Sequence, residues 1–495
     1  MWHDFIRQYA RERPDHPAII DRTTGCSHSY RDLDGVVQDW VGRLFALGVR
    51  RGERVVLVAP NCLEHLTLFF ACARLGAVLV PLNHRLAVQE WTEIIDQLQP
   101  VCLFAPGDGP LARRAEYRDM RAEPPAGPWP EPVEPPVAAE DVLLILYTSG
   151  STGTPKGVML QAGMLMANMH GTVAADVLRR DDISIVNTPF FHTGGYNVFC
   201  LPLLSIGGTL ILHQKFEAGR VLQEIREAGV TVFWGVPTLF QMMIDHPDFS
   251  RTDFSRIRFF LSGGAPLALG LIRRYHACGV PFKQGFGLTE VGPNCFLLET
   301  ADAWLRPDAI GKPMAHSRVK VVDETGQPVA TGQVGEMWIT GPHLCKGYWQ
   351  HQDLFTQSLR DGYFATGDLV RVDEEGFYYV VGRKKEMYIS GGENVYPGEV
   401  EKALAQHAGL VQTVVVGVTD ARWGEVGWLF YVGPQTLTLA EVRDFLDSRL
   451  SRYKHPHHLL RLPEMPLLAN GKVDRPALRA MADRLHREMG VIDHA

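Results

Sequence analysis

A loop rich in glycine and hydroxyl side chains follows an apolar segment near the middle of the first half of the chain. Residues 147–158 read YTSGSTGTPKGV, and the loop consists of Thr148, Ser149, Gly150, Ser151, Thr152 and Gly153, closed by Lys156. Glycine lets backbone N–H groups approach phosphate oxygens, hydroxyl groups add donors, and a lysine adds positive charge. Because Gly157 and Val158 follow the lysine, the pattern is not that of a P-loop. We predict a phosphate-binding loop of another type, with a plain surface linker as the alternative.

Six further segments carry residue types that could take part in catalysis. They read FFHTGG (190–195), SGGAPL (262–267), QGFGLTE (284–290), YFATGDL (363–369), GRKKEMYISGGENVYPGEVE (382–401) and PLLANGKVDR (466–475). Taken singly, His192, Glu290 or Lys472 is explained as well by a structural or solvated position. The functional interpretation therefore depends on the order and the number of these segments.

Together, the seven segments resemble the motifs of the adenylate-forming superfamily, which includes acyl-CoA synthetases, luciferases and peptide-synthetase adenylation domains. The resemblance extends over residues 147–475. It implies an AMP-forming acid–CoA ligase that uses ATP, Mg²⁺ and coenzyme A. In the first step the carboxylate attacks the α-phosphate to give an acyl-adenylate and pyrophosphate. In the second step a thiol displaces AMP.

The resemblance also implies a role for individual residues of the nucleotide site. Phe286 would stack on adenine, Thr289 would contact the α-phosphate, and Glu290 with Thr152 would hold Mg²⁺. The family more often has tyrosine where Phe286 stands, so only the stacking is carried over. Asp368 would accept hydrogen bonds from the ribose hydroxyls, and Arg383 would face ribose or phosphate. Beside the residues of the 148–156 loop, the remaining implied nucleotide contacts are Gly263, Gly264, Ala265, Gln284, Gly285 and Gly287.

The C-terminal motifs imply a mobile small domain. Lys472 would be the adenylation lysine, Lys385 the hinge, and Gly391, Gly392 and Glu393 the lining of the CoA tunnel. We therefore expect a large domain over residues 1–384 and a small domain over residues 385–495.

The acyl pocket is implied to draw on residues that are mostly small or apolar: His192, Gly194, Gly195, Tyr196, Trp234, Gly263, Val291 and Asn294. Such a lining favours an apolar acid. We expect the Gly194–Gly195 pair to widen the pocket for a medium- or long-chain fatty acid. Asn294 as a hydrogen-bonding partner of a ring substituent supports the alternative, an aryl or succinylbenzoate-type acid.

Three rival functions remain beside CoA ligation of a fatty or aryl acid. Residues 190–199 contain no acidic side chain, which disfavours an amino-acid substrate. The GGENVYPGEVE segment resembles CoA ligases more than carrier-protein-dependent domains, so CoA is the expected thiol acceptor. A non-catalytic sensor should lack charged catalytic groups, whereas Lys156, Glu290, Asp368, Arg383 and Lys472 are all present.

The amino-acid composition indicates the class of protein that carries these residues. The chain has 495 residues, 46% hydrophobic and 21% charged, with a net charge of 49 − 56 = −7. These values indicate an ordinary globular protein with no basic field for nucleic acid. The eight cysteines form no C-x-x-C pair, and the N-terminus lacks an apolar signal core, so we expect a cytoplasmic protein without disulfides. The most apolar stretch, Cys62–Leu82, is interrupted by charges and predicts a buried helix followed by a strand, not a membrane span. Weak peripheral contact with a membrane and assembly into a homodimer stay as alternatives that the sequence does not decide.

The pattern of elements predicts an α/β fold. Apolar runs at 55–59, 77–81, 142–147, 209–212 and 231–235 alternate with helical segments such as 218–228 and 238–245, which indicates layers around mainly parallel sheets. We thus expect two α/β layered subdomains within the large domain. After residue 306, strands at 319–322, 334–340 and 377–381 predict a small antiparallel or barrel-like subdomain. Beyond residue 386, helices 397–407 and 439–452 around a strand at 412–418 predict an α+β unit. The proline-rich stretch 123–136 is expected to be a stiff connector.

Overall fold

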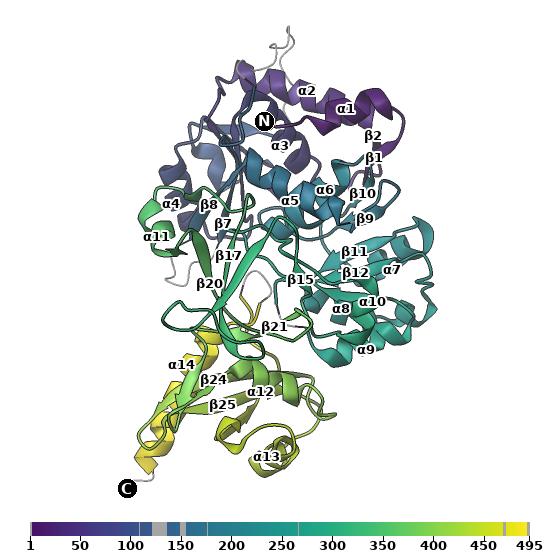
Figure 1. Ribbon diagram of the computed structural model, residues 1–495. Helices are drawn as coiled ribbons and strands as arrows, with labels where there is room; N and C mark the ends of the chain where they lie inside the picture. The colour runs from purple at the N-terminus through teal and green to yellow at the C-terminus, as the bar shows by residue number, and fades with distance from the viewer. Residues whose placement is uncertain are drawn as a thin grey trace.

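The computed structural model describes residues 2–107, 109–120, 136–148, 155–175, 177–265, 267–468 and 472–492. Figure 1 shows a large unit, coloured purple to green, above a smaller unit that contains α12, α13, α14, β24 and β25. The antiparallel strands β17, β20 and β21 lie between the two units.

The first sheet of the large unit has seven strands in the order β13-β12-β11-β9-β10-β1-β2. All neighbouring pairs are parallel except β1 with β2. Its strands are β1 (Pro17–Asp21), β2 (Ser27–Ser29), β9 (Ile183–Val186), β10 (Thr209–Leu212), β11 (Val232–Gly235), β12 (Phe259–Ser262) and β13 (Phe282–Gln284). Because β9, β11, β12 and β13 are parallel neighbours, their carboxyl ends meet at one edge, where open α/β sheets bind ligands.

The second sheet also has seven strands, in the order β18-β8-β7-β4-β3-β5-β6. The pairs from β7 to β6 are parallel, whereas β8 pairs antiparallel with both β7 and β18. Its strands are β3 (Arg54–Val58), β4 (Val78–Leu82), β5 (Cys102–Ala105), β6 (Tyr117–Asp119), β7 (Val142–Thr148), β8 (Lys156–Gln161) and β18 (Gly347–Tyr348). The short strand β18 therefore brings residues from after position 340 beside the phosphate-loop strands.

Helices separate the strands of both sheets. Those of the large unit are α1 (Phe5–Glu12), α2 (Tyr30–Ala46), α3 (Glu64–Leu75), α4 (Val88–Leu98), α5 (Ala162–Ala174), α6 (Cys200–Leu204), α7 (Ala218–Glu227), α8 (Pro237–Ile244), α9 (Leu269–Ala277), α10 (Thr300–Leu305) and α11 (Gln352–Gln357). Short 3₁₀ turns cover Pro110–Arg113 and Pro247–Arg251, and a π-helix, η2, covers Gly194–Val198.

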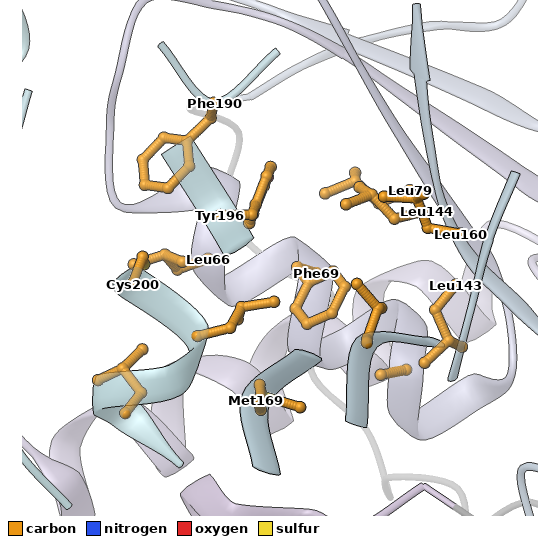
Figure 2. Close-up of a cluster of buried hydrophobic side chains, with 14 of the residues drawn as sticks. Leu66, Phe69, Leu79, Leu143, Leu144, Leu160, Met169, Phe190, Tyr196 and Cys200 are labelled. Atoms are coloured by element: carbon orange, nitrogen blue, oxygen red, sulfur yellow. The ribbon is translucent and has the colours of Figure 1, made fainter. Parts of the chain in front are cut away.

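The main core joins these elements. It contains the fully buried side chains of Phe69 on α3, Leu144 on β7 and Tyr196 on η2. In Figure 2 Tyr196 lies with Phe190 and Leu66 inside this cluster. A second cluster, with Phe240 on α8 and Tyr275 on α9, packs residues of α7, α8 and α9 against β11, β12 and β13.

The region after residue 310 contains a five-stranded antiparallel sheet, ordered β16-β17-β20-β19 with β21 beside β20. Its strands are β16 (Arg318–Val322), β17 (Val334–Thr340), β19 (Leu359–Arg360), β20 (Tyr363–Val372) and β21 (Tyr378–Arg383), and the short pair β14 (Phe296–Leu297) and β15 (Lys312–Pro313) precedes it.

The small unit is built on a second five-stranded sheet. The order is β23-β22-β25-β24, with β26 parallel to β25. Its strands are β22 (Tyr388–Ser390), β23 (Glu393–Val395), β24 (Gln412–Asp420), β25 (Gly424–Val432) and β26 (His458–Arg461), and its helices are α12 (Pro397–Leu404), α13 (Leu439–Asp447) and α14 (Arg475–Ile492), with a 3₁₀ turn at Arg452–Lys454.

The α/β fold class predicted from the sequence is confirmed, and the predicted strands agree with the observed ones within one or two residues at most ends. Two helices end earlier than predicted: α12 at Leu404 instead of 407 and α13 at Asp447 instead of 452. At α13 the chain turns after Ser448, and Arg452 belongs to a separate 3₁₀ turn. Cys62–Leu82 forms α3 followed by β4, as expected. Within the described ranges, no helix is both long and apolar enough to cross a bilayer.

Candidate active site

The phosphate-loop motif lies between β7 and β8. Thr148 and Lys156 are register partners at the open end of this strand pair, and the Thr148 hydroxyl lies 3.5 Å from the Lys156 carbonyl oxygen. Lys156 directs its ammonium group over the Tyr348 ring, 5.1 Å from the centroid. The predicted phosphate contacts Ser149, Gly150, Ser151, Thr152 and Gly153 lie outside the described residues. The same holds for residues 123–135 of the predicted proline-rich connector.

The β8–β18 pair places Tyr348 against the predicted metal ligand. The Tyr348 hydroxyl donates a hydrogen bond of 2.9 Å to Oε1 of Glu290, and the Cys345 N–H donates to the Glu290 carbonyl. Burial raises the pKa of the Glu290 carboxyl, while the Tyr348 hydrogen bond lowers it. No group of three or more metal-binding side chains occurs within the described ranges. One carboxylate still suits Mg²⁺, which takes most of its ligands from water and substrate phosphates.

A second charged group lies at the junction of the two units. Asp368 on β20 faces Arg383 on β21, and the Arg383 Nε lies 2.6 Å from Oδ1 of Asp368. Burial raises the pKa of Asp368 to about 6, although Arg383 acts in the opposite direction. The second carboxylate oxygen of Asp368 is buried and has no hydrogen-bond partner in the described part of the chain. It is therefore available as an acceptor for a ligand hydroxyl.

The predicted adenylation lysine joins this group from the small unit. Lys472 begins the described segment 472–492, and its carbonyl accepts a hydrogen bond from the Leu468 N–H. Burial and the charge of Arg383 lower the pKa of Lys472, whereas Asp368 raises it. Lys472 is thus close to both members of the ion pair. The domain arrangement in this structure brings the lysine to the large unit.

His192 lies on the other side of Lys472. It follows β9, and its pKa is lowered to about 4 by burial and by the positive charges of Lys472 and Arg85. The imidazole is therefore neutral at pH 7. Its Nε2 is buried, and no described residue forms a hydrogen bond with it.

The predicted adenine-site residues cluster at the carboxyl ends of β12 and β13. The Gly285 N–H donates to the Ser262 carbonyl at 2.8 Å, which ties the two strand ends together. Gly264 has φ +79°, a conformation that favours glycine, and Ala265 follows it. Gln284 donates to the Pro307 carbonyl at 2.9 Å. Phe286 packs edge-to-face against Phe296, with 5.7 Å between ring centroids.

The turn after Phe286 is closely packed. A Cβ on Gly287 would lie 2.3 Å from backbone atoms of Pro293, so only glycine fits there. The Leu288 N–H donates to the Gly292 carbonyl, closing the turn that carries Thr289 and Glu290. The structure thus brings Thr289, Glu290 and Lys156 to one region.

The expectation that Gly194 and Gly195 widen the acyl pocket is wrong. A Cβ on Gly194 would lie 2.5 Å from Cζ2 of Trp234, and one on Gly263 would lie 3.3 Å from its Cζ3. The Trp234 indole therefore fills the space beside Gly194 and Gly263. Its Nε1 donates to the Gly194 carbonyl at 3.1 Å. A Cβ on Gly195 would meet the Pro189 carbonyl oxygen at 2.5 Å, so this glycine permits close backbone packing.

Three other residues predicted for the acyl pocket lie in packed interior positions. Tyr196 is fully buried in the cluster shown in Figure 2. Its hydroxyl donates to the His65 carbonyl at 3.0 Å. Val291 is also fully buried. The Asn294 amide donates to the Thr172 hydroxyl and to the carbonyls of residues 197 and 198. Its N–H groups connect α5 to η2, so only the side-chain oxygen of Asn294 could serve a ring substituent.

The predicted hinge and CoA-tunnel residues lie after β21. Lys385 is exposed in a turn in which the Glu386 N–H donates to the Arg383 carbonyl. Gly391 and Gly392 have φ +60° and +87° and form the two-residue turn between β22 and β23. Glu393 follows, and all three are exposed.

Sequence reasoning missed Tyr348 and Asn187. Tyr348 contacts Glu290 and Lys156 only because β18 pairs with β8, and no local pattern signals this pairing. Asn187 and Thr188 follow β9 directly and are buried. Two polar residues directly after the apolar run 183–186, which we had not predicted as a strand, were the available signal.

Known proteins match the chain over almost its whole length. The family model described as "AMP-binding enzyme" matches residues 6–349, and that described as "AMP-binding enzyme C-terminal domain" matches residues 399–472. The chain is 38% identical to a feruloyl-CoA synthase from an Amycolatopsis species, covering 95% of this chain and 96% of that protein. It is 36% identical to an indoleacetate–CoA ligase from Aromatoleum aromaticum, covering 97% and 98%. Among solved structures, ATP-bound MatB from Rhodopseudomonas palustris superimposes with a TM-score of 0.89 at 28% identity, covering 98% and 100%.

Proposed function

The chain belongs to the AMP-binding enzyme family, and we propose that its acid substrate carries an aromatic ring, which it joins to coenzyme A. The protein is an AMP-forming acid–CoA ligase that uses ATP and CoA. The proposal concerns the acid, the roles of individual residues and the division into a large domain (1–384) and a small domain (385–495).

The first half-reaction needs charge neutralisation because two anions, carboxylate and ATP, must meet. Lys472 and Arg383 supply positive charge at the α-phosphate, and the Thr289 hydroxyl adds a donor. The buried acceptor oxygen of Asp368 accepts a hydrogen bond from a ribose hydroxyl, and Arg383 holds its other oxygen in place. Mg²⁺ held by Glu290 would neutralise phosphate charge. His192 borders the reacting carboxylate. Because its imidazole is neutral, it does not weaken the attraction between Lys472 and the anionic substrates.

The second half-reaction requires the thiol of CoA to reach the adenylate carbonyl. Lys472 belongs to the small unit and reaches the Asp368–Arg383 group of the large unit. Rotation about Lys385 would withdraw this lysine and bring the Gly391–Gly392 turn to the site, which is hinge closure of the usual kind. Exposure of both the hinge and the turn is compatible with this movement.

The observation that carries the aromatic proposal is the position of Trp234. Its indole occupies the space beside Gly194 and Gly263, where a wide pocket for an alkyl chain was expected. The indole forms a flat wall at the carboxyl edge of the first sheet. A flat wall suits stacking or edge contact with a planar ring. The aromatic acids named for the feruloyl-CoA and indoleacetate relatives support the same substrate class.

A fatty acid is the second candidate. The chain is 32% identical to the long-chain fatty acid–CoA ligase FadD13 of Mycobacterium tuberculosis, covering 96% of this chain and 97% of that protein. This identity is lower than that to the two aromatic-acid ligases. The Trp234 indole also fills the space beside Gly194 where we had expected room for an alkyl chain. The aryl alternative is therefore better supported than the fatty-acid expectation.

The test is pyrophosphate release with Mg-ATP and one acid at a time, with and without CoA. The panel contains cinnamates, benzoates, arylacetates and C4–C18 fatty acids, and mass spectrometry identifies any thioester. We expect CoA-dependent turnover with at least one aromatic class and kcat/KM at least tenfold above that of any fatty acid. A preference for fatty acids would overturn the aromatic proposal. Pyrophosphate release without a CoA thioester would instead indicate a carrier-protein acceptor.

A further inference from the structure

A small cavity lies behind the Trp234 indole. It has a volume of about 10 Å³ and shares Gly194, Gly195 and Trp234 with the proposed acyl pocket. From there it extends along the end of β9, where Asn187 and Thr188 line it, to Phe199 and Leu210. This volume holds about one water-sized group. The cavity can therefore take a small substituent, and a chain does not fit.

The polar side chains at this cavity lack hydrogen-bond partners in the protein. Asn187 is 5% exposed and Thr188 is 8% exposed. Within the described part of the chain, neither amide atom of Asn187 has a partner, and the Thr188 hydroxyl has none. Most buried polar side-chain atoms are paired, and an unpaired one costs stability. Three unpaired buried polar atoms at one cavity therefore require a physical explanation.

Neighbouring asparagines show that this pattern is local. Asn61 donates to the Thr188 carbonyl at 3.0 Å and accepts from the Phe190 N–H at 3.1 Å. The amide N–H groups of Asn294 form three hydrogen bonds. Both residues hold the protein together, whereas Asn187 forms no hydrogen bond through its side chain to any described group. Its amide is left for a ligand.

We propose that this cavity is a subsite for a hydrogen-bonding substituent on the ring of the acid substrate, with a hydroxyl group as the best match. The inference rests on the proposed function because it requires an aromatic acid in the pocket beside Trp234. A carboxamide and a hydroxyl each donate and accept, so together they satisfy both the proton and the oxygen of a ring hydroxyl. Among the described residues that line the cavity none is charged, so a charged substituent would be desolvated without a partner.

The subsite makes Asn187 a specificity-determining residue. A site that pairs with a substrate hydroxyl discriminates strongly against the analogue that lacks it, because its own polar groups then stay unpaired. We expect the enzyme to prefer 4-hydroxycinnamate over cinnamate by about tenfold or more in kcat/KM. Asn187→Leu, which has nearly the same shape, should reduce this ratio to about one. Most of the change should come from lower kcat/KM with the hydroxylated acid.

The experiment measures pyrophosphate release with both acids for the wild type, Asn187→Leu, Thr188→Val and the control Cys200→Ala. Cys200 also lines the cavity, but its thiol is only a weak hydrogen-bonding group, so its variant should keep the wild-type ratio. Thr188→Val should lower the ratio by severalfold and serves as the test if Asn187→Leu does not fold. Thermal unfolding confirms that each variant is folded.

The outcomes separate this inference from the proposed function. If the wild type turns over both acids with equal kcat/KM, or the ratio survives in folded Asn187→Leu and Thr188→Val, the subsite is wrong and the aromatic proposal stands. If Cys200→Ala changes the ratio as much as Asn187→Leu does, cavity shape and not hydrogen bonding decides, which also overturns the subsite. If the wild type turns over neither aromatic acid but accepts fatty acids, the proposed function itself has failed.

Discussion

The half of the site that we propose binds the nucleotide and the half that we propose binds the acid differ in how many of their polar side chains have partners. At the nucleotide half, Asp368 is paired with Arg383, and Glu290 accepts a hydrogen bond from Tyr348. At the acyl half, the side chains of Asn187 and Thr188 and the Nε2 of His192 are buried without partners in the described part of the chain. Apart from the second carboxylate oxygen of Asp368, which is also buried without a partner among the described residues, the first half is held in place before a ligand arrives. The second half leaves most of its buried polar groups to the ligand.

This difference matches the chemistry of each half. ATP is common to the whole family, so its charged groups can be met by a prearranged set of side chains whose positions cost nothing during the reaction. The acid differs between ligases, and discrimination comes from a few polar groups that only the correct substrate satisfies. The following predictions test the two halves separately, from the largest expected effect to the smallest.

The largest effect is expected at Lys472. Lys472→Ala removes positive charge from the α-phosphate, so pyrophosphate release should fall by about 10²–10³-fold. Thioester formation from a supplied aryl-adenylate and CoA should fall by less than about threefold, because that step needs the lysine withdrawn. The exposed Lys215, which pairs with Glu217, supplies the matched control Lys215→Ala. Normal adenylation by Lys472→Ala would remove this residue from the mechanism.

Glu290→Gln tests the metal-binding part of the nucleotide half. The glutamine oxygen can still accept the hydrogen bond from Tyr348, so the substitution removes charge with little change in shape. We expect pyrophosphate release to fall by about 10²-fold, and half-saturation to require more Mg²⁺. A Mg²⁺ titration at saturating ATP measures this. An unchanged Mg²⁺ requirement would show that the metal is held elsewhere.

Gly194→Ala perturbs the acyl half alone. The added methyl group would lie 2.5 Å from Cζ2 of Trp234, so the indole must move. We expect kcat/KM for the aromatic acid to fall by about tenfold, the scale of one methylene in a pocket. The KM for ATP should stay the same. The double variant Gly194→Ala/Trp234→Phe should recover part of the loss, since a smaller ring leaves room. A loss of ATP affinity equal to the loss for the acid would contradict the separation of the halves.

The smallest effect concerns pH. Burial raises the pKa of Asp368 to about 6 in the ligand-free enzyme, and ribose binding needs the ionised carboxylate. Affinity for AMP should therefore be constant above pH 7 and weaken by up to about tenfold between pH 7 and 5. Calorimetric titration with AMP measures it, and Asp368→Asn should abolish this pH dependence. A slope of the same size in Asp368→Asn would assign it to another group.

The same shift affects stability in the opposite direction. The folded-state pKa of Asp368 lies above its ordinary value of 3.8, so the folded protein binds the proton more tightly than the unfolded chain does. This contribution is fully present below pH 3.8 and is lost as the pH rises through about 6. The carboxylate thus binds nucleotide at the expense of the stability of the free enzyme.

The sequence by itself determined the family, the α/β fold and the identity of the nucleotide half. Its motifs consist of consecutive residues that follow strands, such as 262–265 after β12 and 284–290 after β13, and parallel strand order brings such ends together. Local patterning also located the strands that we predicted within one or two residues at most of their ends. The sequence pattern did not predict the early end of α13, because the turn after Ser448 has no strong local signal.

Only the tertiary structure decided the acyl half. Gly194 and Trp234 are 40 residues apart in sequence, and their contact turns an expected opening into a filled space. The side-chain N–H groups of Asn294 are hydrogen-bonded to residues of α5 and η2. The Asn187 side chain has no hydrogen-bond partner among the described residues. The physical reason is that a side chain's hydrogen bonds and free space are set by neighbours from other elements. A single sequence does not show which elements those are.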